Sequence, residues 1–341
     1  MATTGRRVAV LLNPQAQGVT ARRLAWFRAH VPAADLFVPD GVDAARAAVR
    51  AIAARRYDVL CPGGGDGTFM LAAGELIAST APAEMPALLP LRLGTGNAVH
   101  DVCAASPPTP RGLAHDLARA ADPDDAPSPL RLLDVGGRIT QFAGVGLDAD
   151  WAADYAWLIK RHVGTGRLLP LVRGVPGYVA TAVALTIPRL VRRPFVDVTL
   201  TAIGGGAARL GPDGAAEAEL GDGAVIFRGP ATLAAASTVP SYNAGMRFFR
   251  HVDRIAAERG DAFEVKVAVG GAFTVLRHAG RALAGEPVPG VILDFAVRGL
   301  RVELARPARY HVGGDVLPPS RGFTVGIGPT PVPVLRGRSP A

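Results

Sequence analysis

One stretch of the chain reads Tyr57-Asp58-Val59-Leu60-Cys61-Pro62-Gly63-Gly64-Gly65-Asp66-Gly67-Thr68 and joins an apolar run to glycines and then to a helical pattern. Tyr57–Cys61 predicts a buried strand that ends at Pro62, and a helix is expected to begin at Thr68. Glycines let the backbone approach a ligand and leave N–H groups free, and a helix start favours an anion. The stretch therefore predicts either an anion-binding loop or a plain structural turn.

Strand and helix patterns alternate around this stretch through the first 130 residues. Strands are expected at Val8–Leu12, Leu36–Val38 and Leu88–Leu93, and helices from near Thr20 and over Asp43–Arg56, the latter capped by Asp43. Apolar strands separated by helices predict a parallel sheet covered on both faces. Such sheets bind ligands at the carboxyl ends of their strands.

The chain changes character after a stretch rich in Pro, Asp and Ser at Ala121–Pro129. Strands are expected at Arg131–Val135, Ile139–Val145, Phe195–Ala202, Phe263–Val269, Leu300–Leu304 and Phe323–Ile327, and helices at Ala149–His162 and Tyr178–Val191. This pattern predicts a mainly antiparallel second domain. The expected domains are residues 1–130 and 131–318, and residues 319–341 form a C-terminal segment that either follows them or returns to the first domain.

The composition limits the class of protein. Hydrophobic residues make up 49% of the 341 residues, which excludes a mostly disordered chain. The net charge of +8 favours anionic partners, but the arginines are scattered and aromatic residues are 6%, so a nucleic-acid partner is not expected. Only Lys160 and Lys266 are lysines.

Cysteine usage and apolar runs indicate a cytoplasmic protein. The two cysteines have no metal-ligand spacing, which suits a reducing compartment, and no signal-peptide pattern is present at the N-terminus. The longest apolar stretch, Val175–Ile187, is too short to span a bilayer. Arg189, Arg192 and Arg193 close a longer apolar segment, which is either a core helix or a surface for peripheral contact with an anionic membrane. This segment also contains Leu168, Leu169, Leu171, Val172 and Tyr178.

A second glycine loop, Leu93-Gly94-Thr95-Gly96-Asn97, follows another expected strand. Asn97 either caps a helix or adopts a left-handed backbone, or the loop binds phosphate together with the first one. Asparagine is scarce in the chain, and Asn13 and Asn97 both follow first-domain strands, which favours a functional interpretation.

Several known motifs are absent. Neither lysine stands in a P-loop, Thr68 replaces the third glycine of a dinucleotide fingerprint, and no nucleophile elbow or His-Glu-x-x-His pattern occurs. Asp66 adds negative charge to the first loop, so we expect it to bind a metal, orient a water or polarise an acceptor hydroxyl.

These loops together resemble the diacylglycerol kinase catalytic domain family, which includes bacterial soluble lipid kinases and the sphingosine and ceramide kinases. The resemblance rests on Asn13-Pro14, Gly64-Gly65-Asp66-Gly67-Thr68 and Gly94-Thr95-Gly96-Asn97, in this order. Weaker matches continue to about Leu335 and comprise Phe142–Ala149, Ser241–Met246 and Asp261–Val265.

The resemblance implies a Rossmann-like α/β nucleotide domain of the NAD kinase and diacylglycerol kinase type, followed by an antiparallel β-sandwich that binds lipid. Family members bind ATP in the cleft between these domains and, with Mg²⁺, transfer its γ-phosphoryl group to a lipid hydroxyl. By position, the nucleotide site would comprise Asn13, Gly64, Gly65, Asp66, Gly67, Thr68, Gly94, Thr95, Gly96 and Asn97. Asp66 would lie near the transferred group, and Asp261 with the carbonyl of Phe263 would hold a structural Mg²⁺.

The chain departs from the family at three positions. Ala98 stands where an Asp is usual, and Leu71 where a Glu is usual. Gly313-Gly314-Asp315 replaces the Asp-Gly-Glu whose Asp is the expected general base. Asp315 is then either a displaced base or a surface residue beside a tight turn. Three functions stay open: a lipid kinase, a kinase for a small non-lipid hydroxyl compound, and a nucleotide- or lipid-binding regulatory protein.

Overall fold

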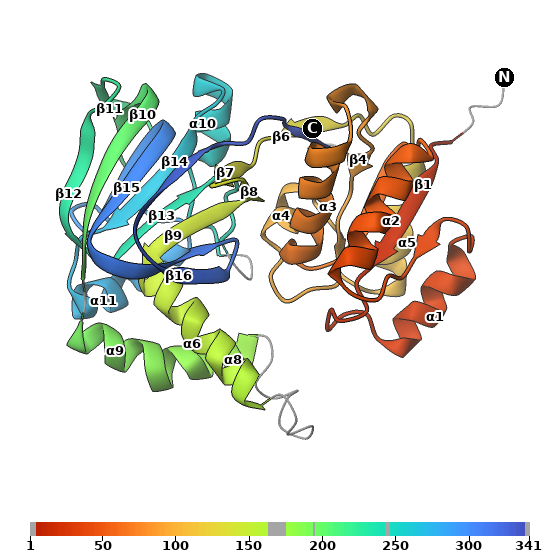
Figure 1. The fold of residues 1–341 in the computed structure, drawn as a ribbon, viewed down its shortest axis with the longest axis horizontal. Helices are drawn as coiled ribbons and strands as arrows, with labels where there is room; N and C mark the ends of the chain where they lie inside the picture. The colour runs from red at the N-terminus through yellow and green to blue at the C-terminus, as the bar shows by residue number, and fades with distance from the viewer. Residues whose placement is uncertain (1–4, 163–174, 194, 243–245, 338–341) are drawn as a thin grey trace. The chain divides into compact units, whose positions relative to one another are not determined.

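A computed structural model describes residues 5–162, 175–193, 195–242 and 246–337, which fall into two compact units (Figure 1). Unit 1 comprises the described residues up to Leu132 and from Gly328 onward, and unit 2 comprises Leu133–Tyr242 and Met246–Ile327. None of the helices in the described ranges is long and apolar enough to cross a membrane.

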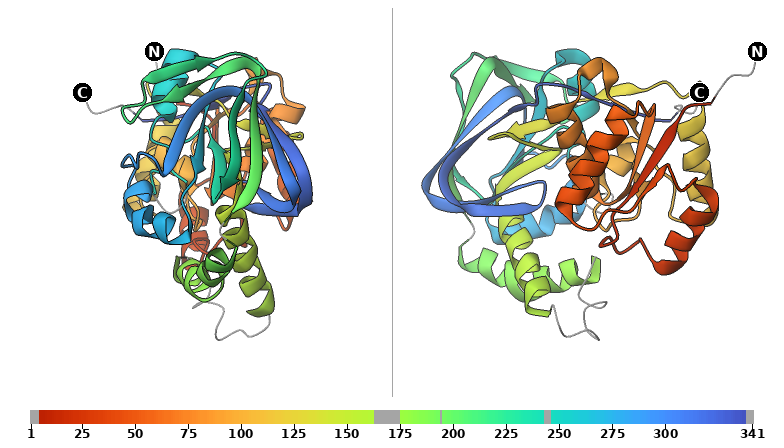
Figure 2. Two further views of the ribbon diagram at one scale, coloured as in Figure 1. Left: turned by 90° about the vertical axis from the view of Figure 1, so that its left-hand side faces the viewer. Right: turned by 45° about the vertical axis from the view of Figure 1, so that its right-hand side comes forward.

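Unit 1 is built on a parallel sheet in the order β2-β1-β3-β4-β17-β6, with β5 beside β3. Its strands are β1 (Val8–Leu12), β2 (Leu36–Phe37), β3 (Val59–Gly64), β4 (Ala87–Leu88), β5 (Leu91–Arg92), β6 (Ser128–Leu130) and β17 (Val332–Val334). Its helices are α1 (Ala21–His30), α2 (Val42–Ala54), α3 (Asp66–Ser79), η1 (Pro82–Glu84), α4 (Ala98–Val102) and α5 (Pro110–Ala121). Helices lie on both faces of this sheet, as the sequence predicted (Figure 2).

Several boundaries in unit 1 differ from the expected ones. Strand β3 does not end at Pro62 but continues to Gly64, because its pairing with β1 extends to Gly63. Pro90 separates β4 from β5, where a single strand was expected, since proline cannot donate a backbone hydrogen bond. Helix α2 is not capped by Asp43: its N-cap is Gly41, which makes no side-chain bond.

The C-terminal part of the chain contributes a strand to unit 1. Strand β17 pairs in parallel with β4 and antiparallel with β6. Val332, Val334 and Leu335 are fully buried. The sheet of unit 1 is therefore completed by a segment about 200 residues away in sequence.

Unit 2 contains one antiparallel sheet of ten strands. They are β7 (Leu133–Val135), β8 (Arg138–Thr140), β9 (Phe142–Gly146), β10 (Val196–Leu210), β11 (Ala216–Leu220), β12 (Val225–Ala231), β13 (Leu233–Ser237), β14 (Phe263–Ala268), β15 (Ile292–Val312) and β16 (Asp315–Ile327). The helical elements are α6 (Leu147–His162), α8 (Val175–Thr181), the π-helical turn η2 (Ala182–Thr186), α9 (Ile187–Arg192), α10 (Val252–Arg259) and α11 (Ala272–Leu283). The mixed α/β class with a parallel and an antiparallel sheet is as predicted.

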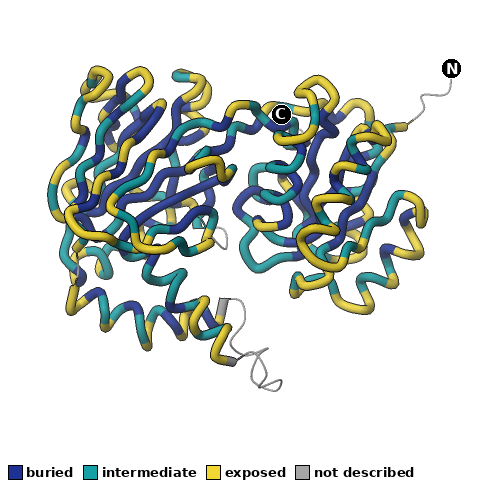
Figure 3. Tube along the Cα trace, in the orientation of Figure 1, coloured by how far each residue is buried: buried dark blue, intermediate teal, exposed yellow. Residues whose placement is uncertain are grey.

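Strand β15 organises unit 2. Its first residues pair with β14 and its last residues, Tyr310–Val312, pair with β9. Because β9 and β14 are also joined through β13, the sheet closes on itself rather than forming two separate sheets. The residues buried between its strands form the largest apolar core of unit 2 (Figure 3).

A cluster of charges is buried at the edge of this core. The Nζ atom of Lys266 lies 3.0 Å from Oε1 of Glu264 and also pairs with Asp294 across the β14–β15 ladder. Glu264 is fully buried, and its Oε2 accepts the N–H of His251 at 2.9 Å. Burial raises the pKa of Glu264 to about 7, although Lys266 opposes the shift. Burial also lowers the pKa of His251 to about 4.

We predict that Lys266→Met destabilises the protein in a pH-dependent way. Removing the cation leaves the buried carboxyl group of Glu264 and the half-buried one of Asp294 without it, which costs about 3–5 kcal/mol. The raised pKa of Glu264 means that the folded state binds this proton more tightly than the unfolded state does. Above that pKa the buried carboxyl group ionises, and this ionisation lowers the free energy of unfolding. The loss of unfolding free energy should be larger at about pH 8 than at about pH 5.5.

Urea denaturation at both pH values measures this difference. Lys160→Met is the matched control, because Lys160 is the only other lysine and is exposed; it should change stability by less than about 0.5 kcal/mol. Equal losses for Lys266→Met at both pH values would contradict the prediction.

Candidate functional site

The two glycine loops of unit 1 lie in direct contact. A Cβ atom at Gly94 would overlap the backbone of Gly65, so only glycine fits there. Backbone hydrogen bonds join the loops: the N–H of Leu93 donates to the carbonyl of Gly64 at 3.0 Å, and the N–H of Asp66 donates to that of Gly96 at 3.2 Å. The two predicted loops therefore form one surface at the carboxyl ends of β3 and β5.

The buried Asp66 carboxylate stabilises this surface from the interior of unit 1. It is 8% exposed, and its two oxygens accept the N–H groups of Ala98 at 3.0 Å and Val99 at 3.1 Å. These N–H groups belong to the first residues of helix α4, whose N-cap residue, Asn97, makes no capping bond with its side chain. Asp66 therefore caps α4 from another part of the chain. Its negative charge is satisfied inside the domain, which favours a positioning role over direct contact with a transferred group.

His100 lies underneath, fully buried. Its Nε2 donates to the carbonyl of Leu91 at 3.2 Å, and its Nδ1 lies 3.7 Å from Oδ1 of Asp66. This histidine supports the loop from the interior.

Backbone donors remain available on the loop surface. No hydrogen-bond partner is found, among the described residues, for the N–H groups of Gly65, Gly67, Thr95, Gly96 and Asn97. Gly67 is exposed, and a Cβ there would meet no atom within 4 Å, so the start of α3 is open. A surface of unpaired N–H groups at a helix start is suited to an anion such as phosphate.

Asn97 and Asn13 have different parts in the site. The Asn97 amide donates to the carbonyl of Gly94 at 3.0 Å, and its Oδ1 is buried without a donor among the described residues. Asn13 donates to Oγ1 of Thr68 at 3.1 Å and accepts the N–H of Gln15 at 2.9 Å. Asn13 therefore fastens the first strand to α3, whereas Asn97 has an acceptor to offer a ligand.

The residues expected to hold Mg²⁺ lie at the start of strand β14. Asp261 is exposed and Phe263 is the first residue of β14. Within the described residues, no three His, Cys, Asp or Glu side chains come close enough together to hold a metal ion. A Mg²⁺ ion held by one carboxylate and one carbonyl would keep several water ligands.

Asp315 is the first residue of β16, directly after a tight hairpin turn. Gly313 and Gly314 have φ of 61° and 92° and connect Val312 directly to Asp315 across the β15–β16 ladder. Such positive φ values are typical of two-residue hairpin turns. Asp315 is exposed, and its carboxylate makes no hydrogen bond to a side chain or backbone group of the described residues.

Unit 2 contains a polar cluster that the sequence did not reveal, formed by Asp148, Tyr242 and His311. Oδ2 of Asp148 lies 2.7 Å from Nε2 of His311 and 2.8 Å from the Tyr242 hydroxyl. Asp148 and His311 are 7% and 1% exposed. Burial, with Asp148 nearby, raises the pKa of Tyr242 well above its ordinary value, so its hydroxyl remains a donor.

An apolar cavity of about 230 Å³ lies beside this cluster. Its walls come from α6, η2, α9, α11 and the strands β13–β15, and the polar side chains among them are Asp148, Thr186, Tyr242 and His278. The volume lies below the roughly 300–1,000 Å³ of typical small-molecule sites. It fits a single hydrocarbon chain rather than a large polar molecule.

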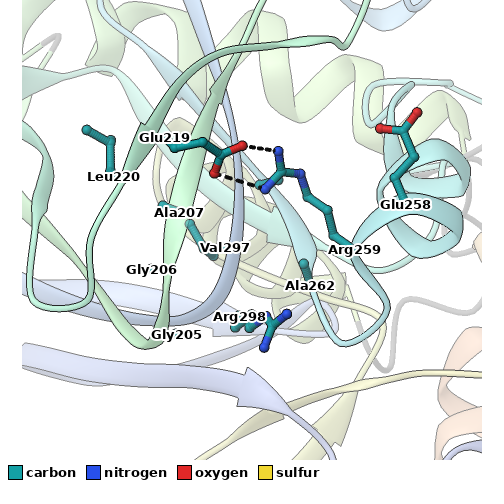
Figure 4. Close-up of a pocket in the computed structure, with 11 residues that line it drawn as sticks. Gly205, Gly206, Ala207, Glu219, Leu220, Glu258, Arg259, Ala262, Val297 and Arg298 are labelled. Atoms are coloured by element: carbon teal, nitrogen blue, oxygen red, sulfur yellow. Dashed lines mark hydrogen bonds and ion pairs between the residues drawn. The ribbon is translucent and has the colours of Figure 1, made fainter.

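A second cavity of unit 2 is polar (Figure 4). The guanidinium of Arg259 forms a two-point ion pair with Glu219, at 2.5 and 3.2 Å, and is thereby neutralised. Arg298 also lines the cavity and is exposed. With its strongest cation already paired, this cavity offers less to an anion than the loop surface of unit 1.

The geometry of the loops agrees with a comparison to known families. Residues 7–125 match the diacylglycerol kinase catalytic domain family. The resemblance predicted from three short loops is thereby confirmed over residues 7–125.

Solved structures share the fold over nearly the whole chain. A diacylglycerol kinase from Bacillus anthracis str. Sterne aligns with a TM-score of 0.62 over 98% of each chain, at 14% identity. Two further chains from the same strain align with the same score and coverage, at 15% identity. At these identities the likeness shows a common fold. No curated protein matches the chain.

We predict that Gly94→Ala destabilises unit 1 while Gly67→Ala does not. The new methyl group at position 94 would overlap the Gly65 backbone, and such overpacking costs about 1–3 kcal/mol. Position 67 is open and helical, so alanine is tolerated there. Urea denaturation of both variants tests this pair; equal stabilities would show that the two loops separate without cost.

Proposed function

We propose that this protein is an ATP-dependent kinase that transfers the γ-phosphoryl group to a lipid hydroxyl. The apolar cavity of unit 2, bordered by Asp148 and Tyr242, carries the proposal. It would accept a hydrocarbon chain and leave a hydroxyl beside polar side chains. A small polar acceptor would find few partners in such a lining.

The nucleotide part of the proposal assigns ATP to the loop surface of unit 1. The unpaired N–H groups of Gly65, Gly67, Thr95 and Gly96 would bind phosphate oxygens, and Oδ1 of Asn97 would accept a hydrogen bond from the nucleotide. Mg²⁺ would enter with the nucleotide phosphates, since the ion commonly binds through substrate phosphates and water. The chain's own contribution is positioning and a field of backbone donors, which phosphoryl transfer requires.

Peripheral contact with a membrane is part of the proposal. Val179, Val183 and Val191 are exposed on the helical elements around the cavity, and Arg192 and Arg193 follow them. Apolar side chains beside arginines suit an anionic lipid surface. Leu168, Leu169, Leu171 and Val172, which the sequence placed in the same region, lie outside the described residues.

We predict that filling the cavity abolishes lipid phosphorylation and spares nucleotide binding. Ala279→Phe places a ring in the cavity, whereas Gly280→Phe places the same ring at an exposed position of α11. With radiolabelled ATP and a broad lipid extract, the first variant should lose at least about tenfold of the parent's transfer, and the control should keep it. ATP affinity from calorimetry should stay the same in both.

The two other candidate functions give different results in this assay. Transfer to soluble hydroxyl compounds but to no lipid would identify a small-molecule kinase. ATP binding without transfer to any acceptor would identify a regulatory protein. Either outcome would contradict the proposed function.

We predict that Asp66→Asn weakens nucleotide binding, because the variant side chain no longer fixes the two glycine loops to the start of α4. The amide presents an NH₂ group towards backbone N–H donors, so unfolding free energy should fall by about 1–3 kcal/mol. ATP affinity should fall by about tenfold or more, because the loop surface loses its support. Asp40→Asn, at an exposed position, is the control. Unchanged ATP affinity with lost turnover would instead assign Asp66 to the transferred group.

A further inference from the structure

The chain lacks a carboxylate at the position where the family resemblance expects a general base. Gly313 has no side chain, and Asp315 is exposed beyond the hairpin turn. A lipid hydroxyl that attacks phosphorus must lose its proton, and a positioned group that accepts it contributes about 10²–10⁴-fold to the rate. Another residue has to supply this function if the proposed function is right.

The Asp148 cluster has the geometry of a positioned proton acceptor. The carboxylate lies in the first turn of α6, and Gly144 leaves room for it, because a Cβ there would overlap Oδ2. Asp148 and Tyr242 both line the apolar cavity, whereas His311 lies behind them. Of the cluster, Asp148 is therefore the acidic group that a bound hydroxyl lipid could meet.

The hydrogen bonds fix the protonation pattern around Asp148. Nδ1 of His311 accepts the N–H of Gly314 at 3.3 Å, so its proton is on Nε2 and is donated to Oδ2 of Asp148. The Tyr242 hydroxyl donates to the same oxygen, and the N–H of Ala149 donates to Oδ1 at 2.7 Å. Three donors thus converge on the Asp148 carboxylate and fix its position.

His311 also explains how the cluster relates to the missing base. It lies on β15 two residues before Gly313, which is the first residue of the hairpin turn. Residue 311 pairs with Gly144, which brings it over the segment that carries Asp148. His311, which supports the Asp148 carboxylate, therefore lies on β15, the strand that leads to the position where the expected base is absent.

We propose that Asp148 is the proton acceptor for the lipid hydroxyl, with His311 and Tyr242 as positioning residues. This inference rests on the proposed function. As the hydroxyl oxygen forms its bond to the γ-phosphorus, the bond from that phosphorus to the bridging oxygen of ADP breaks. The hydroxyl proton passes to the Asp148 carboxylate and then to water, and the products are the phosphorylated lipid and ADP.

Steady-state kinetics with Mg·ATP and the phosphorylated lipid species of the extract test the proposal. Asp148→Asn should lower kcat by about 10²–10⁴-fold with little change in the KM of ATP. Asp253→Asn, an exposed residue on α10, is the matched control and should keep the parent's kcat. His311→Gln should retain more kcat than His311→Leu, because a glutamine amide can still donate to Asp148.

Tyr242→Phe keeps the test decisive if Asp148→Asn fails to fold. It removes one hydroxyl and preserves the ring, so kcat should fall by about tenfold while the KM of ATP stays the same. Parent-like kcat in folded Asp148→Asn, or loss of kcat in Asp315→Asn alone, would overturn this inference and leave the proposed function standing. Absence of lipid phosphorylation by the parent protein would overturn both.

Discussion

The buried Asp66 carboxylate is the interaction on which the loop surface depends. It accepts two N–H groups at the start of α4 while its own N–H donates to Gly96, so two loops from different strands are locked together. Gly65 and Gly94 permit this because their backbones are in contact. The negative charge of Asp66 is thereby balanced by local N–H donors, and the loop N–H groups left over have no partner among the described residues.

The positive field of this surface comes from the backbone. Arg23 donates to the carbonyls of Gly18 and Pro108, and Arg92 pairs with Asp101 at 2.7 Å, so both guanidinium groups are already engaged in the fold. Neither lysine lies in unit 1. These two arginines therefore stabilise structure around the loops, and the donors that the loops leave unpaired are backbone N–H groups, several of them at helix starts.

The sequence predicted local features of unit 1 well because each depends on a few neighbouring residues. The strand–glycine–helix order at Val59–Thr68 and the second loop at Gly94–Asn97 both formed as expected. It left open whether residues 319–341 return to the first domain and did not predict β17 as a strand, because its pairing with β4 joins residues far apart in the chain. The missed Asp148 cluster has the same cause, since its three members come from α6, the segment after β13 and the end of β15.

One local signal pointed to that cluster. Gly144 and Gly146 precede Asp148 at spacings of two, and each glycine is required by contact: a Cβ at Gly144 would overlap the carboxylate, and Gly146 has φ of 98°. Glycines that clear space beside an acidic residue indicate that its position is constrained. The hairpin at Gly313 and Gly314 contributes to the same constraint, because it directs the Gly314 N–H to Nδ1 of His311 and so sets the tautomer that donates to Asp148.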